Sequence, residues 1–328
     1  MPLMPTDRRA LRALLLSVAV AAAGYLAFSL WGGWTQVGQA LAQVGGVGLV
    51  VLLMLSLVNY GLRFVRWQLY LGALGHPQPW RASLRIYLAG FALTTTPGKA
   101  GEALRSLFLQ RRGMPVGRSL AALVSERLSD LVAVVLLCLV GLSQFPALRP
   151  VVAVAVGLMV VAYASIARAR PPGGPAVPPP GARPGLRSAW ARLQQLLAEA
   201  RPCHAPSLLP STTALSLIAW AAEAWAFHLL LGALGSSATL TFSVFVYAVA
   251  VLAGALSFLP GGLGGTEATM MGLLLLTGHG QPVAVAATVL IRLTTLWFAV
   301  ALGLWALLRL MREPGAPPPG AEPLGAAR

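Results

Sequence analysis

The feature that most limits the fold of this chain is a series of apolar segments, most of them interrupted only where arginine appears. A helix needs about 20 apolar residues to cross the hydrocarbon core of a bilayer. Continuous segments of about that length occupy residues 12–31, 46–65, 119–142, 150–167, 211–232 and 282–308. Hydrophobic residues make up 57% of the chain and charged residues 10%, a balance that excludes a soluble globular domain. The sequence therefore predicts an all-α polytopic membrane protein with six full spans.

Two further apolar regions, 84–112 and 240–278, are interrupted by proline and glycine near their middles. Such breaks predict helical hairpins that enter the membrane and return. The break residues are Pro97, Gly98 and Gly101 in the first region and Pro260, Gly261, Gly262, Gly264 and Gly265 in the second. Non-helical backbone at membrane depth is tolerated only where protein or a water-filled cavity satisfies its polar groups. Both breaks therefore indicate functional regions of the protein.

The positive charge of the chain predicts its orientation. Lys and Arg number 24 against 9 Asp and Glu, and these arginines lie between the apolar segments, so they indicate membrane topology rather than nucleic-acid binding. They flank the ends that we expect to be cytoplasmic: Arg8, Arg9, Arg12, Arg63, Arg66, Arg81, Arg85, Arg111, Arg112, Arg118, Arg309 and Arg312. We expect both termini in the cytoplasm, the first hairpin opening inward, and the second opening outward, all in the cytoplasmic membrane.

A shift of 165 residues relates the two halves of the chain. It lays Glu102 on Glu267 and Arg127 on Arg292, and 25 residues separate the Glu from the Arg in each copy. With the opposite hairpin orientations this predicts an inverted-topology repeat, which in secondary transporters places the site near the midplane. We expect a first half at 1–167 whose last span opens the second repeat, a Pro-rich cytoplasmic linker and amphipathic helix at 168–210, the remaining second half at 211–312, and a disordered tail at 313–328.

Charged residues inside the predicted spans and hairpins are the candidate site, because each central charge costs roughly 2.5–3.5 kcal/mol to insert. They are Lys99, Glu102, Arg105, Glu126, Arg127, Asp130, Glu223, Glu267 and Arg292. In one interpretation Arg127 and Arg292 hold an anionic phosphate, while carboxylates bind a cationic headgroup or carry protons. In the other, Arg127 pairs with Asp130 three residues away, and each repeat's Glu pairs with its own Arg as a strut.

For Arg63, Arg66, Trp67 and Glu223 the sequence also offers a structural explanation. Arg63, Arg66 and Trp67 end the second predicted span, where snorkelling side chains and an aromatic belt are expected. Glu223 is either a carboxyl bonded to a neighbouring helix or a site for a proton or cation.

Nothing in the sequence has the spacing of a catalytic, metal or cofactor site. The four histidines are scattered without an HExxH motif, and Cys138 and Cys203 form no CxxC pair. We therefore expect a transporter with no cofactor and no metal. An intramembrane enzyme or an accessory subunit for lipid-headgroup modification or glycosylation is the alternative.

Five motifs carry a family resemblance: Arg63 to Trp67, Thr96 to Arg105, Glu126 to Asp130, Pro260 to Glu267, and Arg292. Together they resemble the transmembrane domain family of lysylphosphatidylglycerol synthases, which is the N-terminal flippase part of the bacterial multiple peptide resistance factor. The resemblance implies a polytopic domain that moves a lipid or lipid-linked headgroup, with a separate lipid-modifying enzyme as partner. It does not define an oligomeric state. In full-length synthases a cytosolic aminoacyl-transferase domain follows the last span. Because 16 residues follow Arg312, we expect no lipid synthesis by this chain.

Overall fold

The structure is a computed structural model that describes residues 16, 24, 34–95, 100–143, 145–169, 186–257 and 259–312. Helices joined by turns and short connectors make up the described residues, which contain no strands. Several expected features lie outside them: the first span at 12–31 apart from two positions, Pro97, Gly98 and Lys99, most of the linker, and the tail. Gly101 and Glu102 belong to helix α4, but their side chains are also outside the described part.

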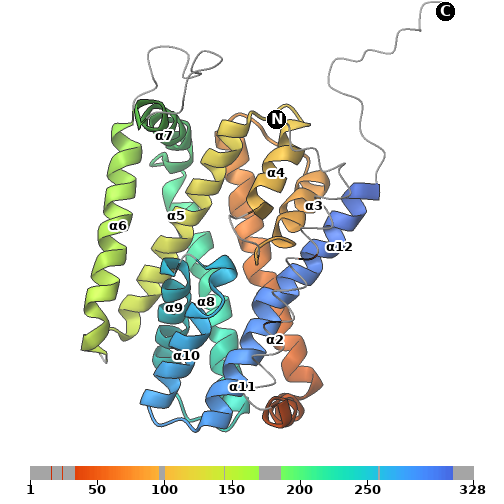
Figure 1. The fold of residues 1–328 in the computed structure, drawn as a ribbon, viewed down its shortest axis with the longest axis vertical. Helices are drawn as coiled ribbons and strands as arrows, with labels where there is room; N and C mark the ends of the chain where they lie inside the picture. Colours follow the sequence, from red (N-terminus) through yellow and green to blue (C-terminus); the bar gives the residue numbers. More distant parts are fainter. Residues whose placement is uncertain are drawn as a thin grey trace, which may run out of the picture.

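Five of the six predicted spans, all but 12–31, correspond to described helices that run along the molecule (Figure 1). Their bounds are α2 Trp34–Ala73, α5 Val116–Gly141, α6 Arg149–Arg168, α8 Leu209–Ala233, α11 Gln281–Arg292 and α12 Phe298–Arg312, with a π-helix at Leu293–Trp297 joining the last two. Within the described residues, four segments are long and apolar enough to cross a membrane: 35–73, 146–168, 209–233 and 281–312. These confirm a helical membrane protein.

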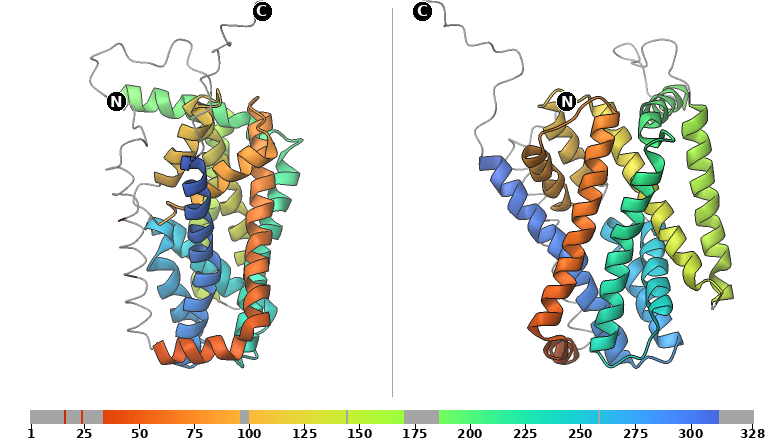
Figure 2. Two further views of the ribbon diagram at one scale, coloured as in Figure 1. Left: turned by 90° about the vertical axis from the view of Figure 1, so that its right-hand side faces the viewer. Right: turned by 180° about the vertical axis from the view of Figure 1, so that it is seen from behind.

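Helix α2 extends well beyond the predicted second span of 46–65. Gly45 has φ +64°, a conformation that glycine adopts without strain, and it separates an initial segment from the long part of α2. That initial segment lies across the end of the bundle, whereas the long part runs along it (Figure 2). At its other end the helix continues to Ala73, so the residues around 65 lie inside the bundle.

Each interrupted region folds as two short helices that lie beside each other. The first consists of α3 (Trp80–Phe91) and α4 (Ala100–Gln110), and the second of α9 (Leu240–Leu256) and α10 (Gly265–Leu276) with a short 3₁₀ turn at Pro260–Gly262. The α3–α4 pair occupies one end of the molecule and the α9–α10 pair the other, in both views (Figures 1 and 2). Helix α12 packs along α3, and α5 packs along α9.

Arginines gather at the end that holds α3 and α4, which we call the arginine-rich end. They are Arg81, Arg85, Arg111, Arg112, Arg118, Arg168, Arg192, Arg201, Arg309 and Arg312. At the opposite end Arg149 is the one arginine within the described residues. Helix α7 (Leu186–Ala200), which the sequence predicts as amphipathic, and the 3₁₀ segment Arg201–His204 follow at the arginine-rich end.

The apolar core is divided between the two ends. A large cluster joins α2, α5, α6, α8, α9, α10 and α11, and two smaller clusters join α3 and α4 to α2, α5 and α12. On α5 the three charged residues Glu126, Arg127 and Asp130 lie between Ala122 of one cluster and Val134 of the other. The charges therefore occupy the layer where the two apolar cores meet.

Candidate functional site

Asp130 on α5 is the centre of the largest group of buried charges. Its Oδ1 accepts a hydrogen bond from Arg66 Nη1 at 2.8 Å, and its Oδ2 lies 3.1 Å from Arg63 Nη2 and 3.3 Å from Arg127 Nη2. The indole Nε1 of Trp220 on α8 donates to Oδ1 at 3.1 Å. One carboxylate thus faces three guanidinium groups, which we call the Asp130 cluster, and the cluster carries surplus positive charge.

Neighbouring polar groups hold the two arginines of α2 in place. Arg66 Nη1 also donates to Ser216 Oγ at 2.6 Å, and the guanidinium of Arg63 lies over the Trp220 ring at 5.3 Å from its centroid. Arg63 Nη1 reaches Asn59 Oδ1 at 3.4 Å, one turn earlier on α2. Three helices, α2, α5 and α8, therefore contribute to one polar assembly.

The cluster leaves hydrogen-bond donors unused. Arg63 Nε, Arg66 Nε and Arg66 Nη2 are buried and have no acceptor within the part of the chain that the structure describes. The side chain of Arg127 is 45% exposed. A buried N–H without an acceptor is costly, so this arrangement favours an added anion with several oxygen acceptors, which Arg127 would meet first.

The snorkelling interpretation of Arg63, Arg66 and Trp67 is wrong. Arg66 is fully buried and Trp67 is 2% exposed, because Asp130 lies opposite and α2 continues seven residues beyond Arg66, about 10 Å along a helix. The sequence held a usable signal for this. Asn59, Arg63, Arg66 and Tyr70 recur at spacings of four, three and four residues, which places them on one helix face.

A separate buried pair connects the first hairpin to α5. Arg105 Nη2 on α4 donates to Glu126 Oε2 at 2.5 Å, and Glu126 is 1% exposed. The Arg105 guanidinium also lies 5.4 Å from the ring centroids of both Trp67 and Tyr87. Cation–π contacts of this kind stabilise a desolvated guanidinium, so the arm of the hairpin is fixed to α2, α3 and α5 together.

A third group connects the second hairpin to the last span. Arg292 Nε donates to Glu267 Oε1 at 2.6 Å, and Arg292 Nη2 donates to the backbone oxygen of Gly261 at 2.7 Å. The other oxygen, Glu267 Oε2, accepts from the backbone N–H of Gly264 at 2.6 Å, which caps α10. Gly261 and Gly264 both have positive φ, so this turn depends on glycine to expose the backbone groups that the pair binds.

Glu223 on α8 is buried with a different kind of partner. The hydroxyl of Tyr247 on α9 donates to its Oε2 at 2.5 Å, and it forms no ion pair with any residue that the structure describes. It lies within electrostatic reach of Arg63 and Arg292. Helix α8, which carries Glu223, packs against α2 and α11, the helices of Arg63 and Arg292.

The structure thus distributes the predicted residues over several groups. Arg127 and Asp130 belong to one cluster, Arg105 and Glu126 to a second, and Glu267 and Arg292 to a third. No contact between Arg127 and Arg292 is present in the described residues, and Glu126 rather than Glu102 provides the described carboxylate next to the first hairpin. Lys99 lies outside the described residues, as does the Glu102 side chain.

The connector between α7 and α8 packs a histidine against the arginine-rich end of the bundle. His204 Nε2 lies 3.1 Å from Ser125 Oγ, and the ring lies edge-on to Tyr163. Burial lowers the pKa of His204 to about 4, and burial raises the pKa of the neighbouring Cys203 thiol to about 12. The imidazole and the thiol are therefore neutral at pH 7.

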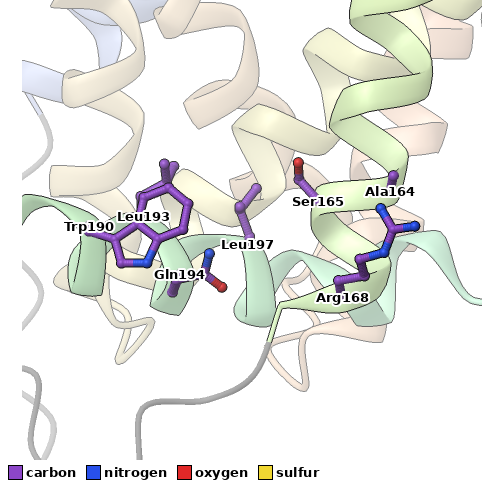
Figure 3. Close-up of a pocket in the computed structure, with 7 residues that line it drawn as sticks. All are labelled: Ala164, Ser165, Arg168, Trp190, Leu193, Gln194 and Leu197. Carbon is purple, nitrogen blue, oxygen red and sulfur yellow. The ribbon is translucent and has the colours of Figure 1, made fainter.

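A shallow groove of about 250 Å³ lies between α6 and α7 at the arginine-rich end (Figure 3). Its walls are mainly apolar, with Arg168 at the end of α6 and Trp190 on α7. Trp190 is 62% exposed and Leu193 is 43% exposed, so the described residues leave this part of the apolar face of α7 uncovered. This is the arrangement of a helix that lies at a membrane interface.

Comparison with known proteins gives the family. The model for the lysylphosphatidylglycerol synthase TM region matches residues 14–303. A UPF0104 membrane protein of Methanothermobacter thermautotrophicus is 23% identical over 298 residues, which cover 85% of this chain and 88% of that protein. The chain belongs to the lysylphosphatidylglycerol synthase TM region family, as its motifs predicted.

Proposed function

We propose that this member of the family is a flippase-like transporter that moves a phosphate-bearing lipid or lipid-linked headgroup across the cytoplasmic membrane. Family membership supports a lipid-related membrane function. The observation that carries the proposal is the Asp130 cluster, in which three guanidiniums share one carboxylate and buried N–H groups have no acceptor among the described residues. A phosphate would supply both the negative charge and the acceptors that the cluster lacks.

The proposed route uses the two hairpins from opposite faces. The arginine-rich end would face the cytoplasm under the positive-inside rule, with both termini there and the halves forming an inverted-topology repeat of six spans. A phosphate would first contact Arg127, the exposed member of the cluster. It would then reach Arg292 by displacing Glu267, the carboxylate that now occupies that guanidinium. Lys99, Glu102, Arg105, Glu126 and Glu223 would line the same polar route.

Transport fits these residues better than catalysis. Each buried carboxylate that the structure describes is engaged with a guanidinium or with Tyr247, which leaves none of them free as a nucleophile or general base. The lipid would therefore be modified by a separate enzyme.

The decisive experiment uses purified full-length protein in vesicles of phosphatidylcholine and phosphatidylglycerol with a trace of head-labelled fluorescent phosphatidylglycerol. Dithionite added outside bleaches only outer-leaflet label, so the extent and rate of bleaching report translocation. Arg127→Gln is the test variant, because Arg63 and Arg66 still hold Asp130 and no buried carboxylate is stranded. Loss of a charge-assisted hydrogen bond predicts translocation slower by about 10- to 100-fold.

Arg312→Gln is the matched control, because Arg312 is an exposed arginine at the end of α12, and it should translocate at the wild-type rate. Wild-type rates for the Arg127 variant would contradict the headgroup role. The appearance of a covalently modified lipid in the vesicles would instead favour the enzyme alternative.

A further inference from the structure

Glu223 differs from the other buried carboxyls that the structure describes in the membrane-spanning bundle. Glu126, Asp130 and Glu267 each have a guanidinium nitrogen within 2.5–2.8 Å. Glu223 is 4% exposed, forms no ion pair in the described part of the chain, and has one hydrogen-bond partner, the hydroxyl of Tyr247 at 2.5 Å. Because an unpaired buried charge is costly, this position favours the neutral acid unless a neighbouring positive charge compensates the carboxylate.

Charged and titratable groups of four neighbouring helices face Glu223. Tyr60 and Arg63 approach from α2, Asp130 from α5, Tyr247 from α9, and Arg292 from α11. Each of the two arginines is already bound to another carboxylate, Arg63 to Asp130 and Arg292 to Glu267. Glu223 thus lies on a helix that packs against the helices of both arginines, and it forms no ion pair with either of them. Burial opposes its ionisation and the arginines favour it, so a change in either arginine's surroundings would alter its protonation.

We propose that Glu223 is a proton-binding site that is loaded and unloaded in step with the anionic headgroup, an inference that rests on the proposed function. With the Asp130 cluster empty, the Glu223 carboxylate offsets the surplus charge of Arg63. When a phosphate binds the cluster, that surplus is removed and the nearby anion disfavours the carboxylate. Glu223 then takes a proton from water. The proton leaves to the opposite face when the phosphate does, so one proton crosses with each headgroup charge.

Coupling of this kind is reciprocal, because a phosphate that raises proton binding must itself bind more tightly when the proton is present. Tyr247 assists both states. Its hydroxyl can donate to the carboxylate and to the carbonyl oxygen of the acid, so Glu223 keeps one hydrogen bond throughout the cycle.

The proton site can be observed directly, without any substrate. Infrared difference spectra of the full chain in phosphatidylcholine nanodiscs, titrated over about pH 4 to 9, should contain a protonated-carboxyl C=O band that titrates. Glu223→Gln should remove this band, and Tyr247→Phe should shift its frequency by removing the hydrogen bond. Glu199→Gln, which changes a carboxyl on α7 outside the bundle core, should leave the band unchanged. A wild-type spectrum in which Glu223→Gln removes no titrating band would overturn the proton site.

The coupling is tested in the same vesicles that are used for translocation, now loaded with a pH-sensitive dye. An inward proton gradient should accelerate inward movement of labelled phosphatidylglycerol by wild type and acidify the lumen. Glu223→Gln should abolish the dependence of the rate on the gradient. If lipid moves and this variant keeps the wild-type gradient dependence, the inference is overturned and the transport function stands. If the Glu223 band titrates and no lipid moves, the proton site stands and the proposed transport is overturned.

Discussion

A buried ion pair anchors each hairpin, but the hairpin contributes the positive group in one pair and the negative group in the other. In α3–α4 the guanidinium belongs to the hairpin, because Arg105 of α4 binds Glu126 of α5 at 2.5 Å. In α9–α10 the carboxylate belongs to the hairpin, because Glu267 of α10 binds Arg292 at the end of α11 at 2.6 Å. Each returning arm is therefore tied to the helix that follows it by one pair. Anchoring therefore requires a matched pair of charges, but the hairpin can contribute either sign.

The pairs differ in what else they hold. Arg292 and Glu267 also bind the backbone of Gly261 and Gly264, so the second anchor fixes the turn itself. Arg105 instead lies over the rings of Trp67 and Tyr87, so the first anchor fixes the arm to neighbouring side chains. Backbone partners are present whenever the turn is formed, whereas side-chain partners depend on packing. The second anchor should therefore tolerate the loss of its arginine better than the first.

The largest expected effect concerns the faces from which the hairpins enter. Single cysteines at Arg112, after α4, and at Gln281, after α10, are placed in a chain without Cys138 and Cys203. Both positions are exposed at opposite ends of the molecule. An impermeant thiol reagent should label the first cysteine from the cytoplasmic side only and the second from the outer side only. Labelling of both from one side would remove the basis for comparing the hairpins as inverted copies.

A second prediction compares the two anchors directly. Arg105→Met leaves Glu126 buried without its guanidinium, and the expected loss is about 3–5 kcal/mol of unfolding free energy. Arg292→Met should lose less, about 1–3 kcal/mol, because Glu267 keeps the Gly264 N–H and the N-terminus of α10. Unfolding in mixed micelles followed by tryptophan fluorescence gives both values.

The matched double variants sharpen this test. Replacing Glu126 by Leu in the Arg105→Met chain removes the stranded charge and should recover most of the loss. The same operation at the second hairpin, with Glu267→Leu, should recover little, because it removes the cap of α10. Equal losses and equal recoveries at the two hairpins would show that the backbone partners of the second anchor contribute nothing.

The elements of the fold were largely predictable because apolar length and proline–glycine breaks are local signals. The expected spans 119–142, 150–167 and 211–232 correspond to α5, α6 and α8. The extension of α2 to Ala73 was not predicted, because Arg63 and Arg66 were interpreted as an end of the hydrophobic region. Only tertiary structure shows that Asp130 and Ser216 satisfy these arginines.

The pairing of the site residues was predictable in part. The strut interpretation named Arg127–Asp130 and Glu267–Arg292, and both pairs are present, whereas the Arg105–Glu126 pair was not predicted. The shift of 165 residues aligns Glu102 with Glu267 and Arg127 with Arg292. Such an alignment gives equivalent positions, but it does not give contacts. Arg127 binds Asp130, whereas Arg292 binds Glu267, since α5 carries an acidic residue three positions from Arg127 and α11 carries none near Arg292. The partner of a charge is decided by the nearest available opposite charge.

A third prediction contrasts glycines at the two hairpins. A Cβ at Gly262, which has φ +67°, would lie 2.8 Å from Thr266 Oγ1 and 3.2 Å from the Gly254 Cα. Gly262→Ala should therefore lower the free energy of unfolding by about 1–3 kcal/mol, measured in the same micelles. At Gly90 of α3 a Cβ would meet Arg105 Cδ at 2.7 Å. The pair with Glu126 and the rings of Trp67 and Tyr87 hold that side chain in place. Gly90→Ala should therefore also lose about 1–3 kcal/mol of unfolding free energy, by straining the first anchor rather than the turn.

The smallest expected effect places pH sensitivity in the connector between the halves rather than in either hairpin. Burial lowers the pKa of His204 from 6.5 to about 4. Between these values the unfolded chain binds a proton that the folded chain does not, so stability is retained above about pH 6.5 and falls as the pH decreases toward 4. Between pH 7 and pH 5 the melting temperature of His204→Gln should therefore fall by about 2–4 °C less than that of wild type. His76→Gln, at the end of α2, is the control and should follow wild type. If the melting temperature of the His204 variant depends on pH as that of wild type does, the acid sensitivity belongs to the ion pairs of the hairpins. The two anchors must then be compared at each pH.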